Sequence, residues 1–150
     1  MRKNGVNKEM KAIPGGVCAP AGFRANGVHC GIRKNKEKKD LALIICTKRA
    51  ATACVYTTNL VKGAPILVTQ KHVADGYARA VIVNSGNANT CNSNGVEIAE
   101  KMCSLVEEYC RIPADDVVVA STGVIGQKLS IDPIAAGMPA LAGGLSLIHI

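Results

Sequence analysis

Short apolar runs, separated by segments rich in glycine, proline and amide side chains, dominate the chain and predict β-strands. The first three runs flank a lysine-rich turn and a short break, and they predict an antiparallel meander. One later run predicts a brief strand, and two more predict buried strands. In chain order the predicted strands are Phe23–Ile32, Leu41–Thr47, Thr52–Thr58, Pro65–Val68, Ala78–Val83 and Asp116–Ala120.

One longer segment, Asn94–Cys110, carries the clearest helical pattern. Its apolar residues recur every three or four positions and form one stripe. Asn94 and Glu97 have the spacing of a capping box, with Asn in place of the usual Ser or Thr. The predicted stripe consists of Val96, Ala99, Cys103, Val106 and Cys110.

Two shorter helices are predicted from turn and capping residues. Thr69 is expected to cap one that runs through Asp75 and is closed by Gly76. Asp132-Pro133 is expected to open the other, with Asp as the cap and Pro at the first position. With the strands, these helices predict a mixed α/β fold in one domain.

The segment Val117–Gly126, VVVASTGVIG, joins a β-branched strand to a small-residue turn. Thr122 places a hydroxyl at the strand end, and Gly123 brings an unshielded N–H beside it. Gly123 and Gly126 permit backbone angles that other residues avoid. Two adjacent donors on a rigid strand end can hold a developing oxyanion. The plainer interpretation is a strand followed by a turn.

A second polar segment, Asn84–Thr90, follows the predicted strand Ala78–Val83. Its amides Asn84, Asn87 and Asn89 are candidates to line or brace a substrate pocket. The alternative is a structural turn, because Asn side chains often bond their own backbone.

The 150 residues carry a net charge of +7, which is concentrated at the front of the chain. Residues 1–39 hold ten basic side chains against two acidic ones, whereas residues 40–150 hold eight against nine. The run from Arg33 to Lys39 lies between two predicted strands, where a solvated turn is expected. No aromatic residue is interleaved with these charges to stack on bases, which disfavours a nucleic-acid-binding module.

Seven cysteines occur without a CxxC pair or zinc-ligand spacing, and their number is odd. Reduced thiols and no metal site are therefore expected, together with a cytosol-like compartment. No secretory signal or membrane-spanning stretch is evident.

The two ends differ from the body of the chain. Residues 1–12 are predicted to be a flexible basic segment, and residues 13–144 the folded part. The final residues 145–150, LSLIHI, resemble the translation of a sequencing adaptor and are expected to be non-native. A native apolar strand is the alternative.

Six motifs occur in an order that resembles one enzyme family. They are GGVCAPAGF (15–23), FRANG (23–27), DLALI (40–44), YTTN (56–59), VNSGNAN (83–89) and ASTGVIG (120–126). Together they resemble the N-terminal part of the bifunctional ornithine acetyltransferase (glutamate N-acetyltransferase) family of arginine biosynthesis.

The resemblance implies a layered α/β (α+β) sandwich of β-sheets flanked by helices, the DmpA-like fold, here truncated. It implies a cytoplasmic enzyme that moves an acetyl group from N2-acetylornithine to glutamate. Some members also use acetyl-CoA as a co-substrate, and no resident cofactor is expected. The family precursor cuts itself before a threonine, and its α and β chains remain together as an α2β2 heterotetramer.

That threonine is the family nucleophile, and it lies beyond this chain, as do the main substrate-binding residues. By resemblance, Thr122 and Gly123 donate to the oxyanion through the hydroxyl and the backbone N–H. The fragment alone is expected to be inactive. A self-processing aminopeptidase or amidase of the same fold is the alternative function.

Overall fold

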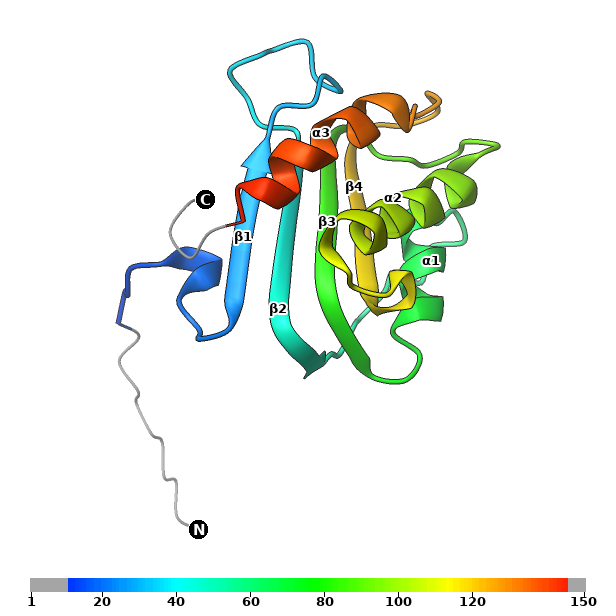
Figure 1. The fold of residues 1–150 in the computed structure, drawn as a ribbon. Coiled ribbons are helices and arrows are strands. Elements are labelled where there is room, and N and C mark those ends of the chain that lie inside the picture. Colours follow the sequence, from blue (N-terminus) through cyan, green and yellow to red (C-terminus); the bar gives the residue numbers. More distant parts are fainter. Residues whose placement is uncertain (1–10, 146–150) are drawn as a thin grey trace.

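Four strands form one sheet in the part of the chain that the structure describes, residues 11–145 of a computed structural model. The sheet order is β1-β2-β3-β4; α2 and α3 lie against one face, and α1 lies beside β4 at the edge of the sheet (Figure 1). The strands are β1 (Phe23–Val28), β2 (Leu41–Ala51), β3 (Tyr77–Asn87) and β4 (Val117–Val124). The helices are α1 (Ala64–His72), α2 (Gly95–Cys110) and α3 (Asp132–Gly143), with short 3-10 turns η1 (Gly16–Cys18) and η2 (Ala114–Asp116). The predicted mixed α/β class is confirmed.

The sheet combines two kinds of strand pairing. β1, β2 and β3 form an antiparallel meander, whereas β3 and β4 are parallel. A parallel pair needs a crossover connection, and α2 lies within it. Both strands of the parallel pair therefore run in the same direction, and their carboxyl ends meet at one edge.

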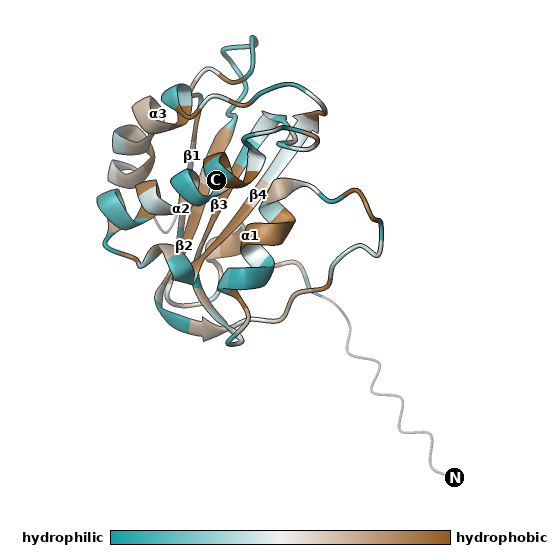
Figure 2. Cartoon of the chain, turned by 90° about the vertical axis from the view of Figure 1, so that its right-hand side faces the viewer, coloured by the Kyte–Doolittle hydropathy of each residue, from teal (hydrophilic) through white to brown (hydrophobic). Residues whose placement is uncertain are grey.

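Side chains along each strand point alternately to the two faces of the sheet. The side chains that point toward the helices form an aliphatic core with residues of α2, α3 and the loop after α2. Its fully buried members include Leu41, Leu43, Ile82, Met102, Val106, Ile112, Val117, Ile134, Met138 and Leu141. Figure 2 shows hydrophobic residues gathered on the strands and hydrophilic ones on the outer surfaces and loops. None of the three α-helices covers the other face, where Ile44, Val81 and Val118 are half-buried in register.

Two of the predicted strands are wrong. Residues 52–58 form no regular structure, and most of their side chains are exposed, because the segment finds no partner strand. The third strand of the meander is β3 instead. Residues 65–68 belong to α1, whose first turn contains Pro65, so Thr69 lies inside this helix and does not cap it.

Other boundaries also move. Leu41–Thr47 and Ala78–Val83 are confirmed as strands, but β2 continues to Ala51 and β3 to Asn87. Phe23–Ile32 stops at Val28 because the chain turns into the lysine-rich loop. The end segments that were predicted to be flexible and non-native lie largely in residues 1–10 and 146–150, outside the described residues. Leu145 packs partly buried against the core.

Helix α2 is confirmed, but its details differ from the predicted pattern. Asn94 is the N-cap residue and makes no side-chain capping bond, so the capping box is absent. Val96 is 46% exposed, whereas Ile98 and Met102 are buried, which rotates the buried stripe. In α3, Ile131 precedes the first residue and is the N-cap, so Asp132 is the first helical residue.

Candidate functional site

The predicted oxyanion donors lie where β4 leaves the core. Val117 and Val119 are buried, whereas Thr122, Gly123 and Val124 are exposed. The strand therefore continues through the predicted turn and carries both groups past the end of the helical layer. Neither the Thr122 hydroxyl nor the Gly123 amide is buried in the packed interior.

Two glycines face each other at this end of the parallel pair. Gly86 of β3 is in register with Gly123 of β4, and their φ angles are +112° and +135°. A Cβ on Gly123 would overlap the backbone of Gly86 and Asn87. Both the left-handed backbone and the close approach therefore require glycine at position 123.

The pairing of β4 sets the direction of the Gly123 amide. The carbonyl of Val124 accepts from Ala88 N at 2.9 Å, so the backbone groups of Val124 point toward β3. Backbone groups alternate along a strand, and the Gly123 N–H therefore points to the outer edge of the sheet. The Thr122 side chain shares the helix-free face with Ser85, its partner in register. A hydroxyl and an N–H from consecutive residues are thus directed to the outside of the described fold.

The three candidate asparagines are buried next to this strand end. Asn84 Nδ2 donates to Asn87 O at 3.0 Å, and Asn87 Nδ2 donates to Gln127 O at 2.9 Å. Asn89 Nδ2 donates to Gly95 O at 2.8 Å, at the start of α2. All three side-chain amides therefore brace the loops around the site. A direct role in substrate binding stays a prediction.

Asp40 anchors the loop between β1 and β2, which packs beside the Gly86–Gly123 pair. Its fully buried carboxylate accepts N–H groups from Cys30 at 2.6 Å, Gly31 at 3.2 Å and Arg33 at 2.8 Å. Burial alone would raise the pKa of Asp40. The hydrogen bonds from Arg33 and Cys30 and the nearby His29 outweigh that effect, so the pKa is below its ordinary value. The carboxylate stays ionised and holds the loop in place.

The outer edge of β4 is sealed by side chains in its buried half. The Thr69 hydroxyl donates to Val119 O at 2.9 Å and accepts from Val119 N at 3.1 Å. His72 Nδ1 bonds the carbonyl of Val117 at 2.9 Å. Since a carbonyl only accepts, this ring nitrogen carries a hydrogen. Helix α1 thus takes the place of a further strand along this part of the edge.

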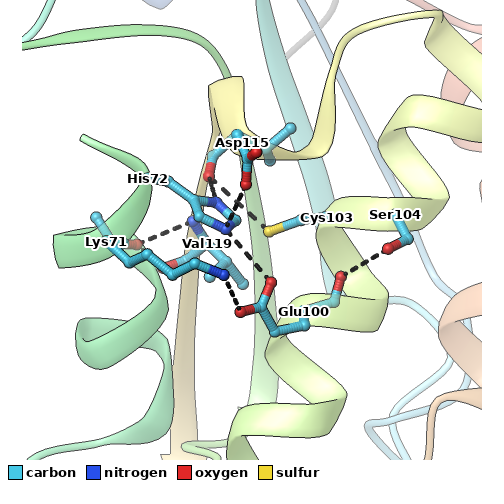
Figure 3. Close-up of polar contacts among 9 residues, drawn as sticks. Lys71, His72, Glu100, Cys103, Ser104, Asp115 and Val119 are labelled. Carbon is cyan, nitrogen blue, oxygen red and sulfur yellow. Dashed lines mark hydrogen bonds and ion pairs between the residues drawn. The ribbon is translucent and has the colours of Figure 1, made fainter. Parts of the chain in front are cut away.

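His72 also lies in a cluster of polar side chains between α1, α2 and η2 (Figure 3). Its Nε2 lies 3.3 Å from a Glu100 oxygen and 3.5 Å from an Asp115 oxygen. Lys71 Nζ pairs with the other Glu100 oxygen at 3.1 Å. These contacts join segments that are far apart in sequence, and no spacing in the chain predicts them.

The thiols near these elements are not poised as nucleophiles. Burial, with hydrogen bonding and repulsion from Asp40, raises the pKa of Cys30 to about 12. Burial, followed by the charges of Glu100 and Asp115, raises the pKa of Cys103 to about 12. Both thiols stay protonated, and only a thiolate is a strong nucleophile. Within residues 11–145, no group of three or more His, Cys, Asp or Glu side chains is arranged to hold a metal ion.

Comparisons with known proteins agree with each other. Residues 24–148 match the model of the ArgJ family. The chain is 41% identical over 138 residues to the arginine biosynthesis bifunctional protein ArgJ of Caldanaerobacter subterraneus subsp. tengcongensis, covering 91% of this chain and 34% of that protein. It is 45% identical over 139 residues to the protein of the same name from Symbiobacterium thermophilum, covering 91% and 35%. The chain thus spans about a third of the length of these relatives.

Two solved structures share the fold. The crystal structure of the arginine biosynthesis bifunctional protein from Bacillus halodurans superposes with a TM-score of 0.81 at 41% identity, covering 87% of this chain and 68% of that one. The ornithine acetyltransferase of Mycobacterium tuberculosis, solved in complex with ornithine, gives a TM-score of 0.82 at 37% identity, covering 87% and 71%. No helix within the described residues has the length and apolar character needed to cross a membrane.

Proposed function

Because this chain belongs to the ArgJ family, we propose that it is the N-terminal part of an acetyltransferase that moves an acetyl group from N2-acetylornithine to glutamate in arginine biosynthesis. The names of the relatives support the pathway, and the ornithine complex of the Mycobacterium tuberculosis protein supports the substrate class. The proposed role of this chain is to stabilise the oxyanion. It does not supply the nucleophile.

The observation that carries this proposal is the corner formed by Thr122 and Gly123. The hydrogen-bond pairing of β4 with the β3 segment turns the Gly123 N–H outward, beside the exposed Thr122 hydroxyl. Donors fixed in advance at the position where charge develops are each worth about 3–4 kcal/mol of barrier lowering in comparable sites. The backbone of a braced strand holds them without reorganisation during the reaction.

The proposed reaction has two acyl transfers. A threonine hydroxyl outside these 150 residues attacks the acetyl carbonyl of N2-acetylornithine, and its own α-amine accepts the proton. The carbonyl oxygen becomes an oxyanion that Thr122 and Gly123 stabilise. The C–N bond then breaks and ornithine leaves with a proton, which leaves an acetyl-threonine ester. The amine of glutamate attacks this ester, and N-acetylglutamate leaves as the threonine is regenerated.

The partner in this proposal is a β chain cut from the same precursor, in an α2β2 assembly. The present chain covers about a third of its curated relatives but about 70% of each solved chain. The solved chains are therefore roughly half as long as the full sequences of the relatives, which supports a two-chain enzyme. The proposed enzyme has no resident cofactor, with acetyl-CoA as an additional acetyl donor, and this chain alone has no activity. We place it in the cytoplasm, although a relative from Physcomitrium patens is named as chloroplastic.

The test is Thr122→Ala in the complete enzyme, assayed for acetyl transfer from N2-acetylornithine to glutamate. We expect kcat to fall about 100- to 1000-fold, with KM changed little, because a contact made only in the transition state is lost. Ser104→Ala, at an exposed position on α2 outside the six motifs, is the control and should keep full activity.

Two results would contradict the proposal. An unchanged kcat in Thr122→Ala would remove the oxyanion role. Hydrolysis of short peptides by the wild type, without any acetyl transfer, would instead indicate the aminopeptidase alternative.

A further inference from the structure

A cavity of about 560 Å³ opens beside Gly123, and all of its charged lining residues are basic. Arg33, Lys34 and Lys38 contribute three positive charges, together with the backbone at Gly86 and Gly123. Glu37 belongs to the same loop but does not line the cavity. We propose that this cavity is a binding site for a phosphate-bearing anion, with Arg33 as its fixed contact.

Arg33 is held in place before any ligand arrives. Its Nε donates to Ser85 Oγ at 3.0 Å, and its backbone N–H donates to Asp40 Oδ2 at 2.8 Å. The side chain is half-buried against β3. Because the bond to Ser85 uses Nε, the two terminal nitrogens can donate to a ligand, and guanidinium groups bind phosphate through paired N–H bonds.

The backbone around Arg33 allows its side chain to lie at this place on β3. Ile32 and Arg33 pack directly on Gly86, where an added Cβ would lie 2.9 Å from Ile32 Cγ2 and 3.1 Å from Arg33 Cγ. The buried carboxylate of Asp40 fixes the same loop through three N–H groups. A site ordered in this way loses little conformational entropy when a ligand binds.

The charge of the site favours phosphate over a single carboxylate. One guanidinium fork is enough for a carboxylate, whereas this cavity adds two exposed lysines and no acidic side chain. A multiply charged group gains from all three cations. The ligand class is therefore a multiply charged, phosphate-bearing anion, and the assignment rests on the lining of the cavity and not on the proposed acetyl transfer.

The experiment measures binding of inorganic pyrophosphate to the complete protein by calorimetry at low ionic strength, where charge screening is weak. Acetate serves as the singly charged probe. We expect pyrophosphate to bind at least ten times more tightly than acetate. Arg33→Gln should weaken pyrophosphate binding about tenfold or more, because a charge-assisted contact is lost. Lys48→Gln, an equal charge change at an exposed position on β2, should leave it within twofold.

A second variant covers the case in which Arg33→Gln does not fold. Lys34→Gln/Lys38→Gln changes only exposed side chains and should also weaken pyrophosphate binding about tenfold, since two nearby charges are lost. Equal affinity in these variants and in Lys48→Gln would overturn the site, as would acetate binding as tightly as pyrophosphate. Thr122→Ala should bind pyrophosphate normally. Loss of acetyl transfer and loss of the anion site are thereby distinguished.

Discussion

The two halves of β4 differ in what happens to their outer edge. In the first half, α1 lies along the strand, and Thr69 and His72 bond the backbone of Val119 and Val117. In the second half, the strand runs past the helices, and the Gly123 N–H points outward beside an exposed hydroxyl. One strand therefore has a sealed half that anchors it and an open half that presents donors.

This difference concerns how much of the outer edge of β4 is covered by α1. Unpaired edge groups invite association with other strands, and proteins usually cover them. Here the covering is done by side chains of a helix only as far as Val119. Thr122 and Gly123 lie beyond that point, where the strand is exposed.

The largest expected loss of stability comes from a substitution at Gly123, in the exposed second half of β4. Gly123→Ala should destabilise the protein by roughly 3 kcal/mol or more, since the new Cβ overlaps Gly86 and the positive φ is strained for alanine. Chemical denaturation measures this loss. Gly126→Ala is the matched control, because its φ is also positive, +78°, but nothing lies within 4 Å of an added Cβ. Equal losses in both variants would show that the Gly86 contact does not decide the result.

A smaller effect is expected at the loop that packs on the open half. Asp40→Asn should cost about 2–3 kcal/mol at neutral pH, because a buried charged acceptor of several N–H groups is replaced by a neutral one. Folding lowers the pKa of Asp40. The wild-type advantage is therefore complete above about pH 4, the unfolded pKa, and is lost as the pH falls through the folded pKa. Denaturation across pH 2–7, roughly the range in which carboxyl groups titrate, measures this. A pH-independent difference would contradict the assigned charge.

The smallest effect is expected in the sealed half. Thr69→Val keeps the shape of the side chain but removes the hydroxyl that serves both backbone groups of Val119, and it should cost about 1–2 kcal/mol. Thr58→Val, at an exposed position, should change the free energy of unfolding by less than about 0.5 kcal/mol. A Thr69 variant as stable as the wild type would mean that water or another group seals the edge equally well.

The sequence predicted the elements whose signals are local. The valine run of β4 and the periodicity of α2 are properties of adjacent residues, and both elements are present. The strand prediction for Pro65–Val68 is wrong because a short apolar run fits a strand or a buried helix equally well, and here it belongs to α1. Thr52–Thr58 has strand-forming residues but no partner, and pairing is decided by the rest of the fold.

The same limit applies to the candidate site. Thr122 and Gly123 could be singled out from one short motif, because the hydroxyl and the amide are neighbours in the chain. Their opposite partner, Gly86, depends on the β3–β4 register, which no local pattern fixes. The hydrogen bond from Arg33 to Ser85 likewise joins segments that meet only in the folded chain.

The parallel pairing of β3 and β4 also bears on the order of assembly. In the meander, β1, β2 and β3 each pair with the next strand in the chain. Gly86 and Gly123 come together only after the crossover through α2 has closed. Closing a longer stretch of chain costs more entropy before any contact rewards it. The corner formed by Thr122 and Gly123 is thus expected to form late in folding, so a nascent chain would complete its antiparallel meander before the proposed donors are in place.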